Sequence, residues 1–478
     1  MSEHDHEHHG MKPLEGMGRY CRRGGERSGQ RDDRFGRMFP DLAPAYTPLS
    51  LLEALGKRGG PLDGQTKNDP GRTIPVGMVF FGQFIDHDIT LDVSTTFDSV
   101  VDDPGEIANV RTPTLDLDCI YGTGPEAQPY LYVQDEPFRG AKLLVGADNP
   151  GQKGLAAHDL LRAPNGRAMI GDPRNDENGV LGQLQLAMIR FHNHVCDVLH
   201  ARTGQTGRAL YEHARREVTF HYQWAVVNDF LVAMCGRPVV DRILGRGRRH
   251  YCGGVPFIPI EFSVAAYRFG HSMIPMELQI RKGDGSHELF GEIIGRGFAP
   301  LEVERGVVDW HELLDTPEGR QVQRAQKLNT KLAADLLELP FIPEGEEKSL
   351  ATRNLLRGNT FLLPAGEAVA EAIGCEASVI TKVRKAVATL APDLSEHGIP
   401  LWLYILAEAE IIGRAEPGGG TSAGAALGPV GATIVAETII GLLELDDHSY
   451  LGANRNWSPE PDWDSVGKIL TAVQTLPT

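Results

Sequence analysis

Four polar residues interrupt an otherwise apolar segment of the chain, GMVFFGQFIDHDITLD at positions 77–92. Gln83 and His87 are four residues apart, so a helix places them on one face; Asp86 can lean toward the same side, whereas Asp88 points elsewhere. A buried carboxylate costs several kcal/mol unless it is paired, hydrogen-bonded, metal-bound or chemically modified. Because a histidine titrates near neutrality, His87 in a dry pocket suits proton transfer. A core histidine satisfied by a neighbouring carboxylate is the competing interpretation.

A second polar segment, GDPRNDEN at 171–178, precedes a long apolar stretch that begins at Leu181. Polar, acidic and turn-forming residues are typical of a helix start, so Asp172 and Asp176 are read first as turn or capping residues. Arg174 and Glu177 are three residues apart. They can pair with each other, or both can face a pocket.

Two further segments carry residues that suit metal chemistry. His271 ends the run AAYRFGH, and the glycine before it removes bulk, as a flat macrocycle bound to the histidine would require. A structural histidine is the simpler alternative. In TPTLDLD, residues two apart face one side of an extended loop. Oxygen ligands for a hard cation such as calcium would then come from Thr112, Thr114, Asp116 and Asp118; a short amphipathic strand is the alternative.

The elements that must position these residues are predicted to be helical. Apolar residues recur at helical spacing in several segments, namely 76–91, 181–199, 215–235, 261–274, 322–339, 367–389 and 429–443. No series of alternating strands separates them. We therefore predict a mainly α fold, a single large α-helical domain with little β structure over residues 46–478, behind a flexible polar arm at 1–45.

The composition fits a globular enzyme. Hydrophobic residues make up 41% and charged residues 23% of 478 residues. A net charge of −17 argues against a general nucleic-acid partner, because binding phosphates needs a basic face. The six cysteines form no CxxC pair and no zinc pattern. No run of 18 apolar residues predicts a membrane span, and the first residues do not resemble an ordinary signal peptide.

Taken in this order and at these separations, the segments resemble the animal-type haem peroxidases of the peroxidase–cyclooxygenase superfamily, from about residue 76 to 451. The resemblance lies in GQFIDHD, LDLDCIYGT, GDPRNDEN, AAYRFGHSMI, ATRNLLRGN and GPVGATIVAETIIGLL. It implies that His87 is the distal acid–base residue, which moves a proton between the two oxygens of hydrogen peroxide. It also implies that Arg174 stabilises the charge that develops as the O–O bond breaks, and that Gln83 donates a hydrogen bond where halide or water sits.

The same resemblance assigns the residues that hold haem b. His271 would ligate the iron, and Asn354 would accept a hydrogen bond from the other ring nitrogen. Arg357 would pair with a haem propionate. Asp86 and Glu177 match the carboxylates that form ester bonds to haem in this family.

At the position after Glu177, mammalian myeloid members place a methionine that forms a sulfonium link to haem. Here that position is Asn178, so no such link is expected. Asp88 matches a calcium ligand, to be joined by Asp116 and Asp118 and by the two threonines of the loop. Asp118 stands where relatives often have serine.

We therefore expect a haem peroxidase that reduces hydrogen peroxide and, through the oxidised intermediate called compound I, oxidises halide, thiocyanate or small aromatic donors. The compact length is similar to that of bacterial members, and without a recognisable leader we expect a cytoplasmic protein or one exported by a non-standard route.

One alternative is a haem fatty-acid dioxygenase of the same superfamily. Those enzymes have a radical-forming tyrosine three residues before the proximal histidine, where this chain has Arg268; Tyr267 is out of register. A non-catalytic calcium- or haem-binding protein is another alternative. A hydrolytic metal site at His192 and His194 is not expected, because residues two apart on a helix diverge by about 200°.

Overall fold

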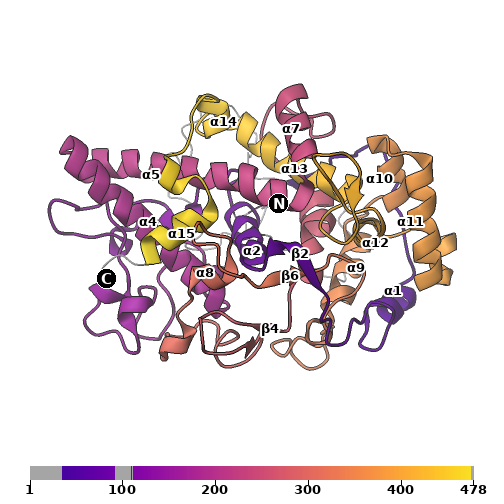
Figure 1. The fold of residues 1–478 in the computed structure, drawn as a ribbon, viewed down its shortest axis with the longest axis horizontal. Coiled ribbons are helices and arrows are strands. Elements are labelled where there is room, and N and C mark those ends of the chain that lie inside the picture. The colour runs from indigo at the N-terminus through magenta and orange to yellow at the C-terminus, as the bar shows by residue number, and fades with distance from the viewer. Residues whose placement is uncertain (1–34, 92–108, 110, 475–478) are drawn as a thin grey trace, which may run out of the picture.

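A computed structural model describes residues 35–91, 109 and 111–474 of the protein. In Figure 1, helix α2 (Gly77–Ile89) lies near the middle of the molecule, with α4, α5 and α15 on one side and α9 to α12 on the other. Its phenylalanines Phe80, Phe81 and Phe84 are all buried. Gly82 allows a close approach to the neighbouring segment, because a Cβ there would lie 2.8 Å from the ring of Phe230.

The described residues are mainly helical, which confirms the predicted fold class. The α-helices are α1 (Leu49–Gly56), α2 (Gly77–Ile89), α3 (Asp118–Tyr121), α4 (Gly179–Thr203), α5 (Gly207–Ala225), α6 (Leu231–Cys235), α7 (Arg237–Arg246), α8 (Trp310–Leu313), α9 (Leu350–Thr360), α10 (Gly366–Ile373), α11 (Ala377–Leu390), α12 (Leu401–Ile411), α13 (Pro429–Leu445), α14 (Tyr450–Ala453) and α15 (Val466–Gln474). Two π-helical turns, η6 (Val226–Phe230) and η7 (Glu261–Ala265), and the 3₁₀ segments η5 (Pro173–Asp176) and η8 (Ala266–Ser272) lie close to the candidate site.

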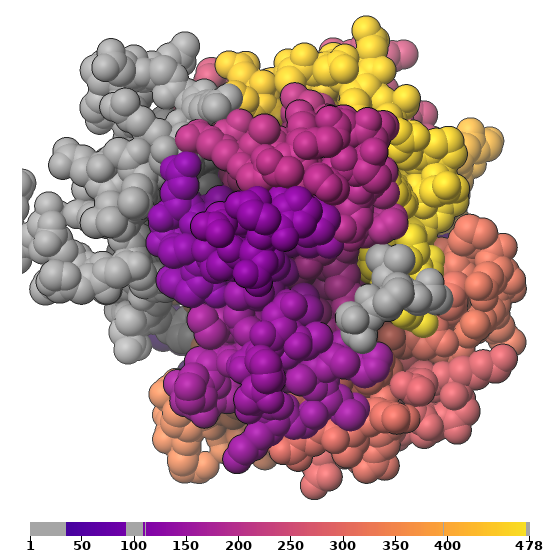
Figure 2. Space-filling model, turned by 90° about the vertical axis from the view of Figure 1, so that its left-hand side faces the viewer, coloured from indigo at the N-terminus to yellow at the C-terminus, as the bar shows by residue number. Residues whose placement is uncertain are grey.

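The described strands form small two-stranded pairs. β1 (Phe35–Gly36) is parallel to β3 (Ile258–Pro259), whereas β2 (Pro70–Pro75) with β6 (Arg324–Gln326), β4 (Glu277–Leu278) with β5 (His287–Glu288), and β7 (Arg414–Ala415) with β8 (Thr421–Ser422) are antiparallel. Figure 2 looks onto the side where residues 111–178 cover much of the surface together with α4 and α5.

Three sequence predictions differ from the structure. The predicted helix 322–339 is wrong: β6 pairs there with β2, and the side chain of Gln326 accepts a hydrogen bond from the backbone of Asp69 at 2.6 Å, so tertiary pairing overrides the helical pattern. The segment 261–274 is helical, but as a π-helical turn followed by a 3₁₀ segment. The segment 367–389 is divided into two helices, because Gly374 adopts a left-handed conformation with φ 87°.

The predicted flexible arm falls partly on residues 1–34, which lie outside the described residues. Residues 35–45 pack on the domain: β1 pairs with β3, and the backbone amides of Met38 and Phe39 donate to the carboxylate of the buried Glu261. The folded part of the chain therefore includes residues that the prediction gave to the arm.

Helices α12 and α13 are buried on almost every side. In Figure 1, α13 lies in the upper middle of the molecule and α12 lies to its right. Glu437, which interrupts the apolar run of α13, accepts at Oε2 three hydrogen bonds from the backbone N–H groups of residues 249–251, while its buried Oε1 has no hydrogen-bond partner among the described residues. Within the described part of the chain, the helices include none with the length and apolar character that crossing a membrane requires.

Glu408 on α12 is a buried carboxyl group that the fold uses as a helix cap. Its Oε2 accepts the N–H of Val430 in the first turn of α13 at 2.8 Å, and its Oε1 has no hydrogen-bond partner among the described residues. Burial raises the pKa of Glu408 to about 8, from an ordinary value of 4.5. Ionisation therefore destabilises the folded protein, and this loss grows as the pH rises from about 4.5 to about 8.

We expect Glu408→Gln to become more stable relative to the wild type as the pH is raised from 5 to 9, because glutamine keeps the acceptor and cannot ionise. The change should be on the order of a few kcal/mol, since one pKa unit is about 1.4 kcal/mol. Urea unfolding at the two pH values measures it. The exposed control Glu371→Gln should show no such trend, and a pH-independent difference for Glu408→Gln would contradict the account.

Candidate functional site

The predicted distal residues come together where the last turn of α2 meets the segment before α4. His87, only 5% exposed, has its Nε2 atom 4.0 Å from Oε1 of Glu177. Gln83, one turn earlier on α2, donates a hydrogen bond from Nε2 to the same carboxylate. Glu177 keeps 36% of its side chain exposed, so this cluster borders an opening. The structure thus brings Gln83, His87 and Glu177 into one site.

A chain of amide side chains holds the other ring nitrogen of His87. Nδ1 of His87 lies 2.8 Å from Oδ1 of Asn175, whose Nδ2 donates to Oε1 of Gln185 at 2.8 Å. Nε2 of Gln185 donates in turn to the backbone carbonyl of Cys119 at 3.1 Å. A backbone carbonyl only accepts, so it fixes the direction of every bond in the chain. Nδ1 of His87 therefore carries the proton, and Nε2 keeps its lone pair.

The side chain of Arg174 is held beside His87 by the carboxylate of Asp172 and by two backbone carbonyls at the end of α2. Its Nε and Nη2 donate to the carboxylate of Asp172, the latter at 2.7 Å. Nη2 also donates to the carbonyls of His87 and Thr90, at 3.0 and 2.7 Å. Nη1 has no hydrogen-bond partner in the described part of the chain. Burial, and then the charge of Arg174, lower the pKa of His87 to about 4, so the imidazole is neutral near pH 7.

The two carboxylates predicted to bind haem covalently both lie near His87. Asp86 accepts a hydrogen bond from Oγ1 of Thr90 at 2.9 Å. Burial raises the pKa of Glu177 to about 7, and the nearby charges of Asp172 and Asp86 add to this shift while Arg174 opposes it. A carboxyl group that is partly protonated near neutrality is held next to the neutral His87.

His271 lies on η8, and the structure brings it to Asn354 on α9. Nδ2 of Asn354 is 3.0 Å from Nδ1 of His271, while Oδ1 of Asn354 accepts a weaker bond from Nη1 of Arg268 at 3.4 Å. The predicted partners therefore meet, but the amide is turned the opposite way from the prediction, because Arg268 takes the oxygen. Arg357 lies three residues further along α9 and is half-buried. Burial and Arg268 lower the pKa of His271 to about 3.

The distal and proximal segments are in direct contact. The hydroxyl of Tyr267 on η8 donates to the carbonyl of Gly82 on α2 at 3.2 Å. Gly270 faces Val79 of α2, and a Cβ built at Gly270 would lie 3.7 Å from a methyl carbon of Val79. The position of α2 thus depends on the same segment that carries His271.

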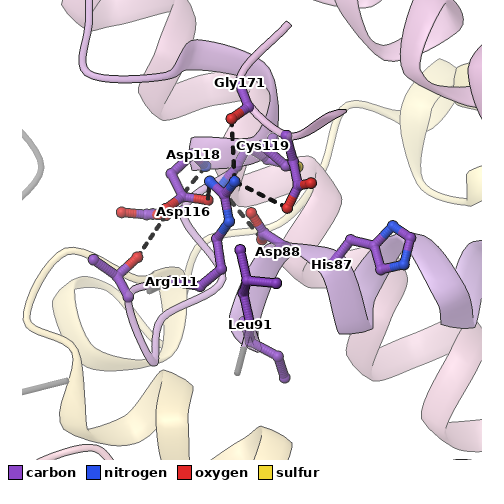
Figure 3. Close-up of polar contacts among 12 residues, drawn as sticks. His87, Asp88, Leu91, Arg111, Asp116, Asp118, Cys119 and Gly171 are labelled. Atoms are coloured by element: carbon purple, nitrogen blue, oxygen red, sulfur yellow. Dashed lines mark hydrogen bonds and ion pairs between the residues drawn. The ribbon is translucent and has the colours of Figure 1, made fainter. Parts of the chain in front are cut away.

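Asp88 leaves α2 on the side away from His87 (Figure 3) and enters a buried group of carboxylates. Oxygens of Asp88, Asp116 and Asp118 all lie within 4.8 Å of one another. Oδ1 of Asp88 and Oδ2 of Asp116 have no hydrogen-bond partner among the described residues. Burial, together with the neighbouring carboxylates, raises the pKa of Asp88 well above its usual range and that of Asp118 to about 7. Such a donor set fits a divalent cation.

The threonines of this loop differ in their contacts. Oγ1 of Thr112 donates to Oδ1 of Asp116 at 3.3 Å, so it borders the cluster. Thr114 is half-buried and makes no side-chain hydrogen bond to the cluster within the described residues. His192 packs as expected: its ring nitrogens bond to the hydroxyl of Tyr121 and the carbonyl of Ala141, at 3.1 and 2.8 Å.

Three residues of the site are absent from the sequence predictions: Asn175, Gln185 and Arg111. Gln185 is a fully buried polar residue inside the apolar stretch of α4. A polar residue in such a stretch indicates a hydrogen-bond partner, because buried polar groups are nearly always hydrogen-bonded. Asn175 lies between Arg174 and Glu177 in GDPRNDEN, a segment whose polar residues are typical of a helix start, so its type gave no separate signal. Arg111 precedes the predicted cation loop and carried no spacing signal.

Comparison with known proteins identifies the family. Residues 92–375, more than half of the chain, match the family model for animal haem peroxidases; this segment begins after His87 and includes Arg174, His271 and Asn354. The chain belongs to the animal haem peroxidase family. This membership places it in the peroxidase–cyclooxygenase superfamily and implies haem and an oxidoreductase activity.

Individual relatives are distant. A chorion peroxidase of Drosophila melanogaster is 32% identical over 186 residues, which cover 36% of this chain and 22% of that protein; the match thus spans less than a quarter of the relative. Among solved structures, peroxidase A of Dictyostelium discoideum has a TM-score of 0.61 at 15% identity, covering 92% and 93% of the two chains. A fatty acid α-dioxygenase of Arabidopsis thaliana has a TM-score of 0.57 at 17% identity, covering 91% and 74%. These two structures share the fold.

We expect Asn175→Leu to destabilise the protein by about 1–3 kcal/mol, because it leaves buried groups of His87 and Gln185 without a partner. Urea unfolding measures the difference from the wild type. Asn454→Leu, at an exposed position, is the matched control and should change stability by less than about 0.5 kcal/mol. Equal effects of the two substitutions would show that the amide chain does not hold the site.

Proposed function

We propose that the protein is a haem peroxidase, which reduces hydrogen peroxide to water with two electrons from a small reducing substrate such as a halide, thiocyanate or an aromatic donor. The observation that carries the proposal is the state of His87: its ring is neutral, its Nδ1–H is tied to Asn175, and its Nε2 lone pair faces the carboxylate of Glu177. A positioned imidazole of this kind is a general base.

The residues present fit a haem group. His271, which is neutral and in contact with Asn354, would hold the haem iron, and Arg357, on the same helix as Asn354, would pair with a propionate. Iron on Nε2 of His271 requires a proton on Nδ1, so the amide of Asn354 would turn to present its oxygen. Asp86 and Glu177 are the carboxylates that would form ester bonds. When bound, the haem supplies the iron that accepts the peroxide oxygen and exchanges electrons.

The protein residues supply the proton transfer. Nε2 of His87 would take a proton from one oxygen of hydrogen peroxide and return it to the other oxygen, which would leave as water. The Asn175 chain keeps Nδ1 protonated throughout, so only Nε2 exchanges a proton. Arg174, whose charge is anchored by Asp172, stabilises the negative charge that develops on the departing oxygen. Two protons and two donor electrons complete the reduction of one peroxide to two waters.

We expect His87→Leu to slow the reaction of the haem-loaded enzyme with hydrogen peroxide by about 10²–10⁴-fold, because the general base is removed. Stopped-flow absorbance of the Soret band measures this rate, and the unchanged spectrum before mixing controls for haem content. His448→Gln, at an exposed position, should react like the wild type. A His87→Leu enzyme of wild-type rate would contradict the assignment.

A fatty-acid dioxygenase is the second candidate, and the shared fold with the plant α-dioxygenase favours it. Tyr267 is half-buried beside helix α2, but it stands four residues before His271, and its hydroxyl donates to the carbonyl of Gly82. The position three residues before His271 holds Arg268, whose Nε donates to the carbonyl of Ser263 at 3.0 Å. Rapid oxygen uptake with a long-chain fatty acid and no added peroxide would favour the dioxygenase over the peroxidase.

We also propose that Asp88, Asp116 and Asp118, with Thr112 and Thr114 of the same loop, bind calcium. Two buried oxygens support this proposal, Oδ1 of Asp88 and Oδ2 of Asp116, because neither has a hydrogen-bond partner among the described residues, although the latter lies 3.8 Å from Nη2 of Arg215.

Removing calcium with a chelator should lower the melting temperature, and added calcium should restore it, because a cation that binds only the folded state stabilises it by about 2.7 kcal/mol at a concentration of 100 Kd. Differential scanning calorimetry measures the shift. The response should be lost in Asp116→Asn and kept in Asp393→Asn, an exposed control. The site would be refuted if neither the chelator nor added calcium changed the melting temperature of the wild type.

A further inference from the structure

Arg111 lies between the carboxylate cluster and the distal site (Figure 3). It is 9% exposed. Its Nη1 is 3.1 Å from Oδ1 of Asp118, and its Nη2 is 2.9 Å from Oδ2 of Asp172 and also donates to the carbonyl of Gly171 at 3.1 Å. One guanidinium therefore joins a carboxylate of the cluster to a carboxylate of the distal segment.

Asp172 continues this connection to Arg174. Asp172 is fully buried, and its Oδ2 forms an ion pair with Nη2 of Arg111 at 2.9 Å and accepts a hydrogen bond from Nη2 of Arg174 at 2.7 Å. The same Nη2 of Arg174 donates to the carbonyl of His87. A continuous chain of alternating charges thus runs from Asp118 to the backbone of the residue proposed as the general base.

The positive charge of Arg111 acts on both carboxylates that it contacts, Asp118 and Asp172. The partners Asp118 and Asp172 raise the pKa of Arg111 above its ordinary value despite burial, so the group is a permanent cation. A cation that takes Asp118 as a ligand must compete with the guanidinium of Arg111, whose Nη1 lies 3.1 Å from Oδ1 of Asp118, and the two positive charges repel each other. At the other end, Arg111 holds Asp172, which holds Arg174.

We propose that Arg111 is a positioning residue that couples occupancy of the carboxylate cluster to the placement of Arg174. It lowers the affinity of the cluster for a cation, and it transmits a change at Asp118 through Asp172 to the distal site. This inference rests on the proposed function for the roles of Arg174 and of the cluster. Coupling between two sites is reciprocal. It can therefore be measured as a change in ligand affinity at either site.

The first test measures cation affinity directly, by terbium luminescence and by calorimetric titration with calcium, on the wild type, Arg111→Met and Arg111→Lys. Removing the competing charge should tighten binding in Arg111→Met by at least about tenfold, whereas Arg111→Lys, which keeps the charge, should stay close to the wild type. A residue that only supported the loop would give the opposite sign, with weaker binding in both variants, and that result would overturn the inference. Arg139→Met, at an exposed position, is the control and should leave the affinity unchanged.

The second test measures coupling in the haem-loaded protein. The dissociation constant of cyanide, read from the Soret band, should depend on calcium in the wild type and Arg139→Met, and this dependence should be lost in Arg111→Met. The coupling would be overturned if the dissociation constant of cyanide did not change with calcium in the wild type. It would also be overturned if that constant changed with calcium equally in Arg111→Met. These outcomes are separate from the proposed peroxidase activity, which fails only if the wild-type enzyme does not react with hydrogen peroxide.

Discussion

The protein depends on one turn of helix that serves two sites. His87 and Asp88 are neighbours at the end of α2, and helix geometry directs consecutive side chains about 100° apart. His87 meets Asn175 and Glu177, while Asp88 enters the buried carboxylate cluster. A displacement of this turn would therefore disturb the proton-transfer group and the cluster together. The bonds from Arg174 to the carbonyls of His87 and Thr90 hold the same turn from outside the helix.

Both sets of contacts lead back to residues 118 and 119. The amide chain from His87 ends at the carbonyl of Cys119, and the charge chain from Arg174 ends at the carboxylate of Asp118. The start of α3 is thus the common support of the two residues proposed as general base and as distal arginine. A cation bound by Asp88 and Asp118 would join α2 to α3 at this point. This arrangement would give a physical reason for the proposed cation site to accompany the proposed peroxide-reacting site.

The sequence was sufficient for the parts of the site that follow from local periodicity and from motif spacing. Gln83 and His87 share a face of α2 as predicted, and Asp88 turns away to the cluster with Asp116 and Asp118. Arg111 and Asn175 could not be predicted, because their roles depend on partners 61 and 88 positions away, Asp172 and His87. The prediction of a helix at 322–339 failed for the same reason, because β6 pairs with the distant strand β2 in this segment. The orientation of Asn354 was also missed, because Arg268 competes for its oxygen.

The central claim is that the haem-loaded protein reduces peroxide with electrons from a donor. The most direct measurement is a stoichiometric one, in which a known amount of hydrogen peroxide is added with an excess of a one-electron aromatic donor while dissolved oxygen is monitored. The account predicts two donor molecules oxidised for each peroxide consumed, with no net uptake of oxygen. Peroxide that is not consumed by the haem-loaded protein, or oxidation that requires dissolved oxygen instead of peroxide, would contradict it.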